Sequence, residues 1–333
     1  MQHSPSSLSA PKALAPSGPI RIGARGSKLS MVQARATQAD IVRLLGADPK
    51  DADEIAPITP ITTTGDRIQD RRLLEIGGKA LFTKEIEEAL LDGRIDLAVH
   101  CVKDMAVLMP PGLAVAAYPE REDVRDAVIS PFSGRIEDLP FGARLGTASL
   151  RRQAQALALR PDLQLHLLRG NVDTRLAKLE AGEADAILLA AAGLRRLGLA
   201  DRITGLIDPN VCPPAPGQGA LALQTREADQ DHPVLKALHH APSALTVAAE
   251  RGALEALEGS CKTAIGAHAS LQGSRLFLVV EGLKADGTAR WRREGAAPVG
   301  SDPQKSAKLV YQLGLELGEA VRKDGGDDLI TAL

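Results

Sequence analysis

Short apolar segments that end in charged or polar residues alternate with helix-like segments over the first two thirds of the chain. This rhythm predicts α/β layers, because strands joined by crossover helices pack with one handedness. Ligands of such sheets bind beyond the carboxyl ends of the strands. The expected strands cover residues 20–25, 95–99, 127–130, 163–168 and 186–190. A common site at their ends should contain Arg25, Lys103, Asp104 and Arg169.

Helix signals follow these strands. Ser27 is expected to cap a helix that runs to Gly46, since serine is a preferred N-cap residue. Further helices are expected near 83–91, within 146–159 and from Asn171 to Gly182. The continuous apolar run at 186–190 indicates a strand that is covered on both faces.

A chain of 333 residues is longer than one hydrophobic core usually serves. The proline-rich and glycine-rich segment 213–219 is typical of a crossing between domains, and beyond about Ala241 the pattern changes to helix, strand and helix. This last part should have a strand at 276–280 and a final helix with a stripe of Leu309, Leu313 and Leu317. We therefore predict two similar doubly wound α/β domains and a smaller α+β C-terminal domain. The expected bounds are 1–18 for a flexible tail, 19–118 with 217–238 for domain 1, 119–216 for domain 2 and 239–333 for domain 3.

Composition argues against several classes of protein. A net charge of −2 and few aromatic residues (four Phe, two Tyr and one Trp) argue against nucleic-acid binding. No run approaches the roughly 18–20 apolar residues of a membrane span. The N-terminal segment lacks the pattern of a secretory signal, and the three cysteines lack metal-site or disulfide spacing. We expect a cytoplasmic protein with a small-molecule ligand, without nucleic-acid, membrane or metal partners.

Arginine is dense between Leu145 and Gly198. Arg151 and Arg152 fall at an expected helix start, where cations are unfavourable unless an anion is bound there. The density predicts a site for a polycarboxylate or polyphosphate, although some of these arginines must form ordinary surface salt bridges. The arginines are Arg151, Arg152, Arg160, Arg169, Arg175, Arg195 and Arg196.

Asp104 and Cys261 are candidate reactive residues. Asp104 could serve as an acid–base group or as the counter-charge of a cationic intermediate, whereas spacing alone favours a carboxylate that is satisfied within its loop. Cys261 lies in a turn beside Lys262, which would favour the thiolate, but free cysteines are usually inert. His100 and Cys101 should point to opposite faces of a strand, so a catalytic pair is not expected there.

Several motifs in this order resemble those of the porphobilinogen deaminase (hydroxymethylbilane synthase) family. The resemblance covers nearly the whole chain from Ile20 onward. The motifs are Ile22–Ser27 (IGARGS), Gly77–Phe82 (GGKALF), Asp96–His100 (DLAVH) with Lys103-Asp104, Gly146–Arg152 (GTASLRR), Arg169–Asn171 (RGN) with Thr174-Arg175, Pro216–Gly219 (PGQG) and Leu257–Cys261 (LEGSC).

The resemblance implies a transferase of tetrapyrrole biosynthesis that joins four porphobilinogen molecules head to tail into hydroxymethylbilane and releases ammonia at each addition. It implies a dipyrromethane cofactor that is attached to Cys261 through a thioether. Asp104 should stabilise the positive charge that develops as ammonia leaves. The family fold resembles type II periplasmic binding proteins in its first two domains, and we expect a monomer.

The resemblance also assigns the remaining site residues. Each pyrrole ring carries an acetate and a propionate, so several cations should line the cleft. Phe82 either stacks on a pyrrole ring or lies in the core. The other expected cofactor contacts are Lys103, Asp104, Thr147, Ser149, Arg151, Arg152, Arg169 and Gly170. The expected substrate contacts are Arg25, Ser27, Lys79, Phe82, Arg175, Arg196 and Gln218.

Two other functions compete with this one. A non-catalytic polycarboxylate-binding protein of the periplasmic type would leave Cys261 and the third domain unexplained. A thiol-dependent hydrolase would need a general base and an oxyanion hole, for which the sequence gives no candidates. The chain departs modestly from the family pattern: Cys101 and Ala148 both stand where serine is common.

Overall fold

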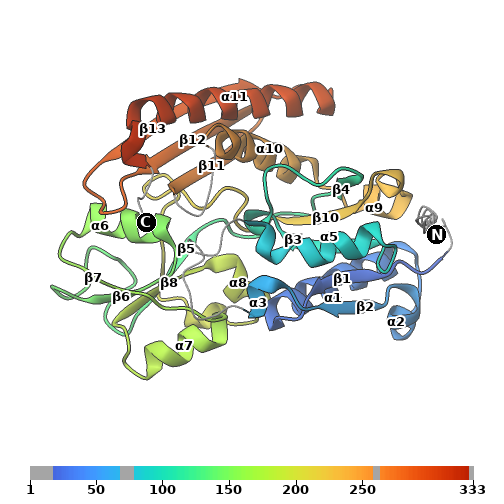
Figure 1. The fold of residues 1–333 in the computed structure, drawn as a ribbon, viewed down its shortest axis with the longest axis horizontal. Coiled ribbons are helices and arrows are strands. Elements are labelled where there is room, and N and C mark those ends of the chain that lie inside the picture. Colours follow the sequence, from blue (N-terminus) through green and yellow to red (C-terminus); the bar gives the residue numbers. More distant parts are fainter. Residues whose placement is uncertain (1–17, 68–78, 258–262, 330–333) are drawn as a thin grey trace, which may run out of the picture.

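The computed structural model describes residues 18–67, 79–257 and 263–329. They form three β-sheets with helices packed against them (Figure 1). Cys261 and all but the last residue of the expected N-terminal tail lie outside the described ranges. Within those ranges, no helix combines the length and apolar character that a membrane span requires.

The first sheet has the strand order β2-β1-β3-β10-β4. β1 is parallel to β2 and β3, whereas β10 is antiparallel to both of its neighbours. The strands are β1 (Ile22–Arg25), β2 (Ile58–Ile61), β3 (Leu97–Cys101), β4 (Leu113–Ala117) and β10 (Leu221–Arg226). The accompanying helices are α1 (Lys28–Leu44), α2 (Ala52–Ile55), α3 (Thr64–Arg67), α5 (Lys84–Leu91) and α9 (Pro233–Ala237).

The second sheet repeats this plan strand for strand, in the order β7-β6-β8-β5-β9. β6 is parallel to β7 and β8, and β5 is antiparallel to β8 and β9. The strands are β5 (Asp126–Ile129), β6 (Arg144–Gly146), β7 (Gln164–His166), β8 (Ala186–Ala190) and β9 (Gly205–Leu206). The helices are α6 (Leu150–Leu159), α7 (Val172–Glu180) and α8 (Ala191–Arg196). The predicted similarity of the two α/β units is thus confirmed.

Strand β8 shows why its sequence is apolar without alternation. Ile187 and Leu189 belong to one core cluster, whereas Ala186 and Leu188 belong to another. Because successive side chains of a strand point to opposite faces, the two clusters lie on opposite faces of the sheet. Both faces are therefore covered, as the sequence predicts.

Polar caps start helices directly after the strands. The Ser27 hydroxyl accepts a hydrogen bond from the Ser30 amide at 3.3 Å, which confirms Ser27 as the N-cap of α1. Ser149 caps α6 and Asn171 caps α7 in the same way. These caps fix the positions of three helix N-termini, two of them in the arginine-rich unit.

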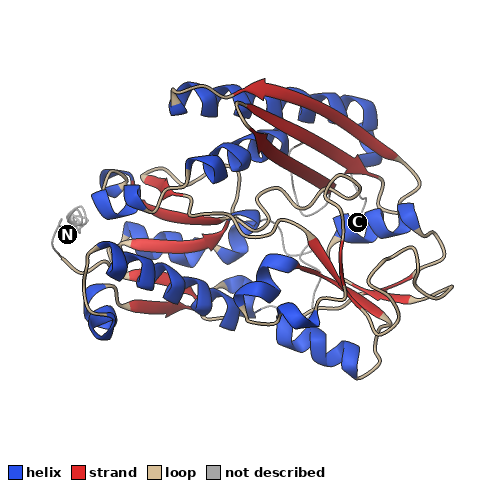
Figure 2. Ribbon diagram, turned by 180° about the vertical axis from the view of Figure 1, so that it is seen from behind, coloured by secondary structure: helices blue, strands red, loops and turns tan. Residues whose placement is uncertain are grey.

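The third sheet is an antiparallel meander of three long strands, β11 (Ala264–Gln272), β12 (Arg275–Leu283) and β13 (Arg290–Pro298). The helices α10 (Ala241–Ala256) and α11 (Pro303–Gly325) pack against it (Figure 2). The sequence predicted the middle strand alone. β11 is rich in Ala and Gly and β13 in Arg, so neither has the β-branched and aromatic composition of a typical strand.

The predicted leucine stripe of α11 is wrong in part. Leu313 and Leu317 pack against the core, but Leu309 is 42% exposed. The buried face of α11 consists instead of Ser306, Val310, Gly314, Gly318, Val321 and Gly325. A Cβ atom at Gly314 would lie 2.1 Å from the backbone oxygen of Ala249. The closest helix contact thus requires glycine, which a hydrophobicity pattern does not detect.

Sheet membership supports our division of the chain into domains. β4 ends at Ala117 and the chain then enters the second sheet, whereas β10 returns to the first sheet after the segment 213–219. We therefore propose the expected bounds, with the first domain formed by 19–118 and 217–238. The remaining connections contain the 3₁₀ helices η1 (Pro49–Asp51), η4 (Ala200–Arg202), η5 (Glu227–Asp229) and η6 (Gly326–Leu329).

Candidate active site

A cleft of about 630 Å³ lies between the first two sheets. Its walls come from residues at or directly after the carboxyl ends of β1, β3, β6, β7 and β8. This is the edge at which open α/β sheets bind ligands. The structure brings together the four side chains that the strand pattern placed there, Arg25, Lys103, Asp104 and Arg169.

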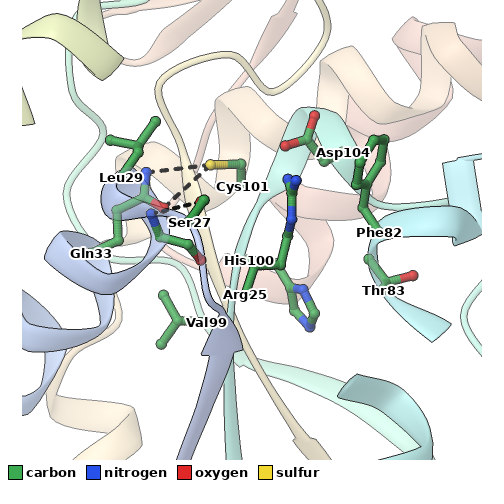
Figure 3. Close-up of a pocket in the computed structure, with 11 residues that line it drawn as sticks. Arg25, Ser27, Leu29, Gln33, Phe82, Thr83, Val99, His100, Cys101 and Asp104 are labelled. Carbon is green, nitrogen blue, oxygen red and sulfur yellow. Dashed lines mark hydrogen bonds between the residues drawn. The ribbon is translucent and has the colours of Figure 1, made fainter. Parts of the chain in front are cut away.

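A smaller hollow of about 60 Å³ adjoins the cleft and shares several of its residues (Figure 3). Arg25 extends from the end of β1 toward Asp104 and Phe82, while Cys101 lies beside Gln33 (Figure 3). Phe82 belongs to the 3₁₀ helix η2 (Lys79–Phe82). The side chain of Lys79 lies outside the described part of the structure.

Asp104 has the geometry of a carboxylate that is available to a ligand. It ends the 3₁₀ helix η3 (Val102–Asp104), which follows β3 without a break. In the described ranges, its side chain makes no hydrogen bond and no ion pair, so it is not satisfied within its own loop.

Arg25 is held on two sides. Its Nη2 lies 2.5 Å from Oδ1 of Asp66, and its guanidinium carbon lies 4.3 Å from the centroid of the Phe82 ring. The Thr63 hydroxyl donates to Asp66 at 2.7 Å. Burial lowers the pKa of Arg25, but the hydrogen bond to Asp66 and the charge of Asp104 raise it further. Phe82 was expected either to stack on a pyrrole ring or to lie in the core. In the structure it lines the cleft, and its ring stacks on the guanidinium of Arg25.

Cations outnumber acids in the lining of the cleft. Seven cationic and three acidic side chains line it. In the part of the chain that the structure describes, four of these cations form no ion pair: Lys103, Arg169, Arg175 and Arg196.

The three arginines among these cations have either a missing hydrogen-bond partner or a bond to a backbone carbonyl. Nη1 of Arg169 is buried and has no hydrogen-bond partner among the residues that the structure describes. Arg175 donates to the carbonyl oxygen of Gly170, whose φ of +120° favours glycine, and Arg196 donates to that of Gly219. Burial, then the charges of Arg152 and Arg169, lower the pKa of Arg175 to about 10. Burial is the largest cause of this shift, and an anionic ligand would offset the repulsion that the two neighbouring guanidinium groups add.

Lys103 is the fourth cleft cation that forms no ion pair with the described residues. Burial, followed by the charge of Arg152, lowers the pKa of its ammonium group. Its Nζ lies 3.4 Å from Oε1 of Gln218. Arg152 lines the cleft and also forms a buried ion pair with Asp126, a residue that no motif pointed out.

Four predicted ligand contacts are not among the residues that line the cleft. Gln218 is fully buried and its amide has protein partners on both sides, so we propose an indirect role for it in place of direct contact with substrate. Arg151 is likewise buried and bonded to Asp126, Gln155 and the Pro213 carbonyl. The other two contacts are Thr147, which is fully buried, and Ser149, which caps α6.

The anion at the start of α6 thus belongs to the protein itself. The sequence predicted an anion beside Arg151 and Arg152. In the structure, both guanidinium groups form ion pairs with the carboxylate of Asp126. Burial would raise the pKa of Asp126, but the two adjacent guanidinium groups hold it far below its usual range. The only sequence signal for this ion-pair partner was that Asp126 stands at the start of an otherwise apolar strand.

Two other arginines form the expected ordinary salt bridges. Arg160 pairs with Asp162 at 2.7 Å, and Arg195 pairs with Asp123 at 3.2 Å. Neither lines the cleft. The arginines of this segment therefore fall into three groups: those that line the cleft, those in ordinary salt bridges, and those in the buried cluster around Asp126.

The described thiols and the adjacent histidine lack the properties of a catalytic pair. Burial, followed by the charge of Asp104, raises the pKa of Cys101, and burial raises that of Cys212 to about 12. His100 bonds to Gln224 at 2.9 Å, and burial lowers its pKa to about 4. A hydrolase that uses Cys101 is therefore not favoured, because the thiolate is the nucleophilic form.

We expect Cys101 and Cys212 to resist alkylation in the native protein. At pH 7.5 almost all of both thiols should be protonated, so iodoacetamide should modify them at least 100-fold more slowly than in urea. Peptide mapping by mass spectrometry would measure both rates. Modification of native Cys101 at the rate of the unfolded chain would contradict its raised pKa.

Comparison with known families assigns both major parts of the chain. Residues 20–233 match the family model described as "Porphobilinogen deaminase, dipyromethane cofactor binding domain". Residues 244–319 match the one described as "Porphobilinogen deaminase, C-terminal domain".

Individual proteins show the same relationship. The porphobilinogen deaminase of a Caulobacter species is 63% identical over 313 residues, which cover 94% of this chain and 98% of the relative. That of Phenylobacterium zucineum is 62% identical over 316 residues, covering 93% and 98%. Among solved structures, a periplasmic substrate-binding protein of an ABC transporter from Coxiella burnetii is 15% identical, with a TM-score of 0.38 over 66% of this chain and 89% of its own. The two matched domains and the high identity to full-length relatives show that the chain belongs to the porphobilinogen deaminase family.

Proposed function

We propose that this protein is a transferase that condenses four porphobilinogen molecules into hydroxymethylbilane, with uptake of one water and release of four ammonia molecules. One observation carries the proposal: among the described residues, four cations of the cleft form no ion pair, and the same cleft contains the carboxylate of Asp104, which is also unpaired there. The cations match the acetate and propionate groups of the substrate. The carboxylate matches the positive charge that develops when ammonia leaves.

The residues present fit a dipyrromethane cofactor. Nη1 of Arg169, which is buried without a hydrogen-bond partner among the described residues, and the adjacent guanidinium of Arg175 support carboxylates as ligands of this site. Lys103, Arg152 and Arg169 would hold the carboxylates of the cofactor, and Cys261 would carry its thioether. When bound, this group supplies the pyrrole carbon to which new rings are joined.

The chain's own side chains bind and orient the incoming substrate. We assign its carboxylates to Arg25 and Ser27 on one side and to Arg175 and Arg196 on the other. The pairing with Asp66 and Phe82 holds Arg25 in place before substrate arrives, which reduces the entropy lost on binding. Asp104 then stabilises the developing cation electrostatically.

The alternative of a non-catalytic binding protein is not favoured. An anion-binding site gains nothing from an unpaired carboxylate, since Asp104 would repel the ligand. We also propose that the protein is a monomer. We further propose that it is cytoplasmic, which agrees with the free thiols of Cys101 and Cys212.

The intact mass of the denatured protein tests the proposed function. We expect the wild type to exceed its polypeptide mass by one dipyrromethane unit and to gain evenly spaced increments after brief incubation with porphobilinogen. A Cys261→Ser variant should fold but lack the cofactor mass. If wild-type protein incubated with porphobilinogen gains no mass and releases no ammonia, the proposal is wrong.

A further inference from the structure

Asp126 is the centre of a buried network that reaches the cleft without lining it. Its side chain is 2% exposed, at the start of β5. Oδ2 of Asp126 lies 2.6 Å from Nη1 of Arg151, and Oδ1 lies 2.7 Å from Nη2 of Arg152. Oδ1 also accepts a hydrogen bond from Nε2 of Gln218 at 2.9 Å. One carboxylate thus holds three side chains that the sequence had assigned to ligand binding.

The hydrogen bond to Gln218 fixes the orientation of that amide. Nε2 of Gln218 donates to Asp126 and to the carbonyl oxygen of Val124. Oε1 is therefore turned the other way, where it lies 3.4 Å from both Nζ of Lys103 and Nη2 of Arg152. Lys103 belongs to the first α/β unit and Arg152 to the second, so the amide joins one cation from each wall of the cleft.

The remaining bonds of Arg152 complete this constraint. Nε of Arg152 donates to Asp126, and Nη1 donates to the carbonyl oxygen of Leu188 in β8. A planar guanidinium held at three positions has one orientation toward the cleft. From this geometry we propose that Asp126 is a positioning residue, which sets the directions of Arg152 and, through Gln218, of Lys103 for productive placement of the growing chain.

The proposal rests on the proposed function and makes a specific kinetic prediction. In Asp126→Asn, one carboxylate oxygen becomes an NH₂ group that faces arginine or Gln218 donors. The cleft keeps every cation, so the substrate should still bind, and KM should stay within threefold of the wild type. Misdirected cations should lower kcat by about 10- to 100-fold, as expected for small misplacements of a reacting group.

The experiment compares Asp126→Asn with Asp162→Asn, which removes the acidic partner of Arg160 outside the cleft. Intact mass gives the fraction of each protein that carries the cofactor, and kcat is calculated for that fraction alone. Near-wild-type kcat for Asp162→Asn with a reduced kcat and unchanged KM for Asp126→Asn is the expected result. Wild-type kcat in loaded Asp126→Asn would overturn the proposal.

A second variant tests whether Asp126 acts on Lys103 through Gln218. Gln218→Met keeps the volume and leaves the arginine pairs of Asp126 intact, so it tests the proposal even if Asp126→Asn fails to fold. We expect a kcat loss of about 3- to 10-fold, and a loss in the double variant smaller than the product of the two single losses. Unchanged kcat in Gln218→Met would refute the proposal that Gln218 positions Lys103. An inactive wild type without cofactor mass would refute the proposed function instead.

Discussion

Replacement of Asp104 by asparagine is expected to lower turnover by about 100- to 1000-fold while the protein keeps its covalent cofactor. The side chain keeps its shape but loses the charge opposite the developing cation. A full charge at about 4 Å is worth about 4 kcal/mol at an effective dielectric constant of 20, which sets the upper end of this range. Single-turnover release of ammonia, together with intact mass, would separate the chemical step from cofactor assembly.

The matched control for this substitution is Asp92→Asn. Asp92 lies in the same α/β unit, in an exposed pair with Arg94 that does not line the cleft. Its turnover should equal that of the wild type. An Asp104→Asn enzyme that releases ammonia at the wild-type rate would refute the electrostatic role of the carboxylate.

Arg121→Leu is expected to lower the free energy of unfolding by about 3–5 kcal/mol, because it leaves a buried carboxylate without its cation. Both nitrogens at the end of Arg121 donate to Glu250, which is 0% exposed. Glu250 also accepts hydrogen bonds from the amides of Gly217 and Ala269. The pair thereby joins α10 to both chain crossings between the α/β units.

Urea unfolding followed by the fluorescence of Trp291 measures this effect in the third domain. Trp291 is the only tryptophan of the chain and packs against the core of that domain. The control, Arg43→Leu, removes an exposed partner of Asp40 and should change stability by less than about 1 kcal/mol. Equal unfolding midpoints for the two variants would mean that the Arg121–Glu250 pair does not hold the domains together.

The α/β units were predictable because the periodicity of their apolar residues and the positions of their turn residues predict the same strands and helices. Strand β8 and the helix capped by Ser27 appear where the sequence predicts them. The third domain was predicted less well. β13 begins Arg-Trp-Arg-Arg-Glu, and β11 is made of small residues, so their strand character comes from pairing with β12 rather than from local preference.

The candidate site was likewise predicted in part. Arg25, Lys103, Asp104 and Arg169 were placed at one edge by their positions after strands, and they share the cleft. Arg151 and Gln218 lie behind its wall, although their motifs resemble those of ligand-binding residues. A motif records which side chains act near a ligand, but it does not distinguish a side chain that touches the ligand from one that holds its neighbour.

The sequence by itself determined the family, the two α/β units and the edge at which the cleft lies, because strand ends, helix caps and motif order are local properties of the chain. Only the tertiary structure decided which cations are free. Arg151 and Arg169 are both arginines of the same segment, yet Asp126 neutralises the first, whereas the second forms no ion pair within the described ranges. That difference depends on whether a carboxylate from a distant strand packs against the guanidinium, which spacing along the chain does not encode.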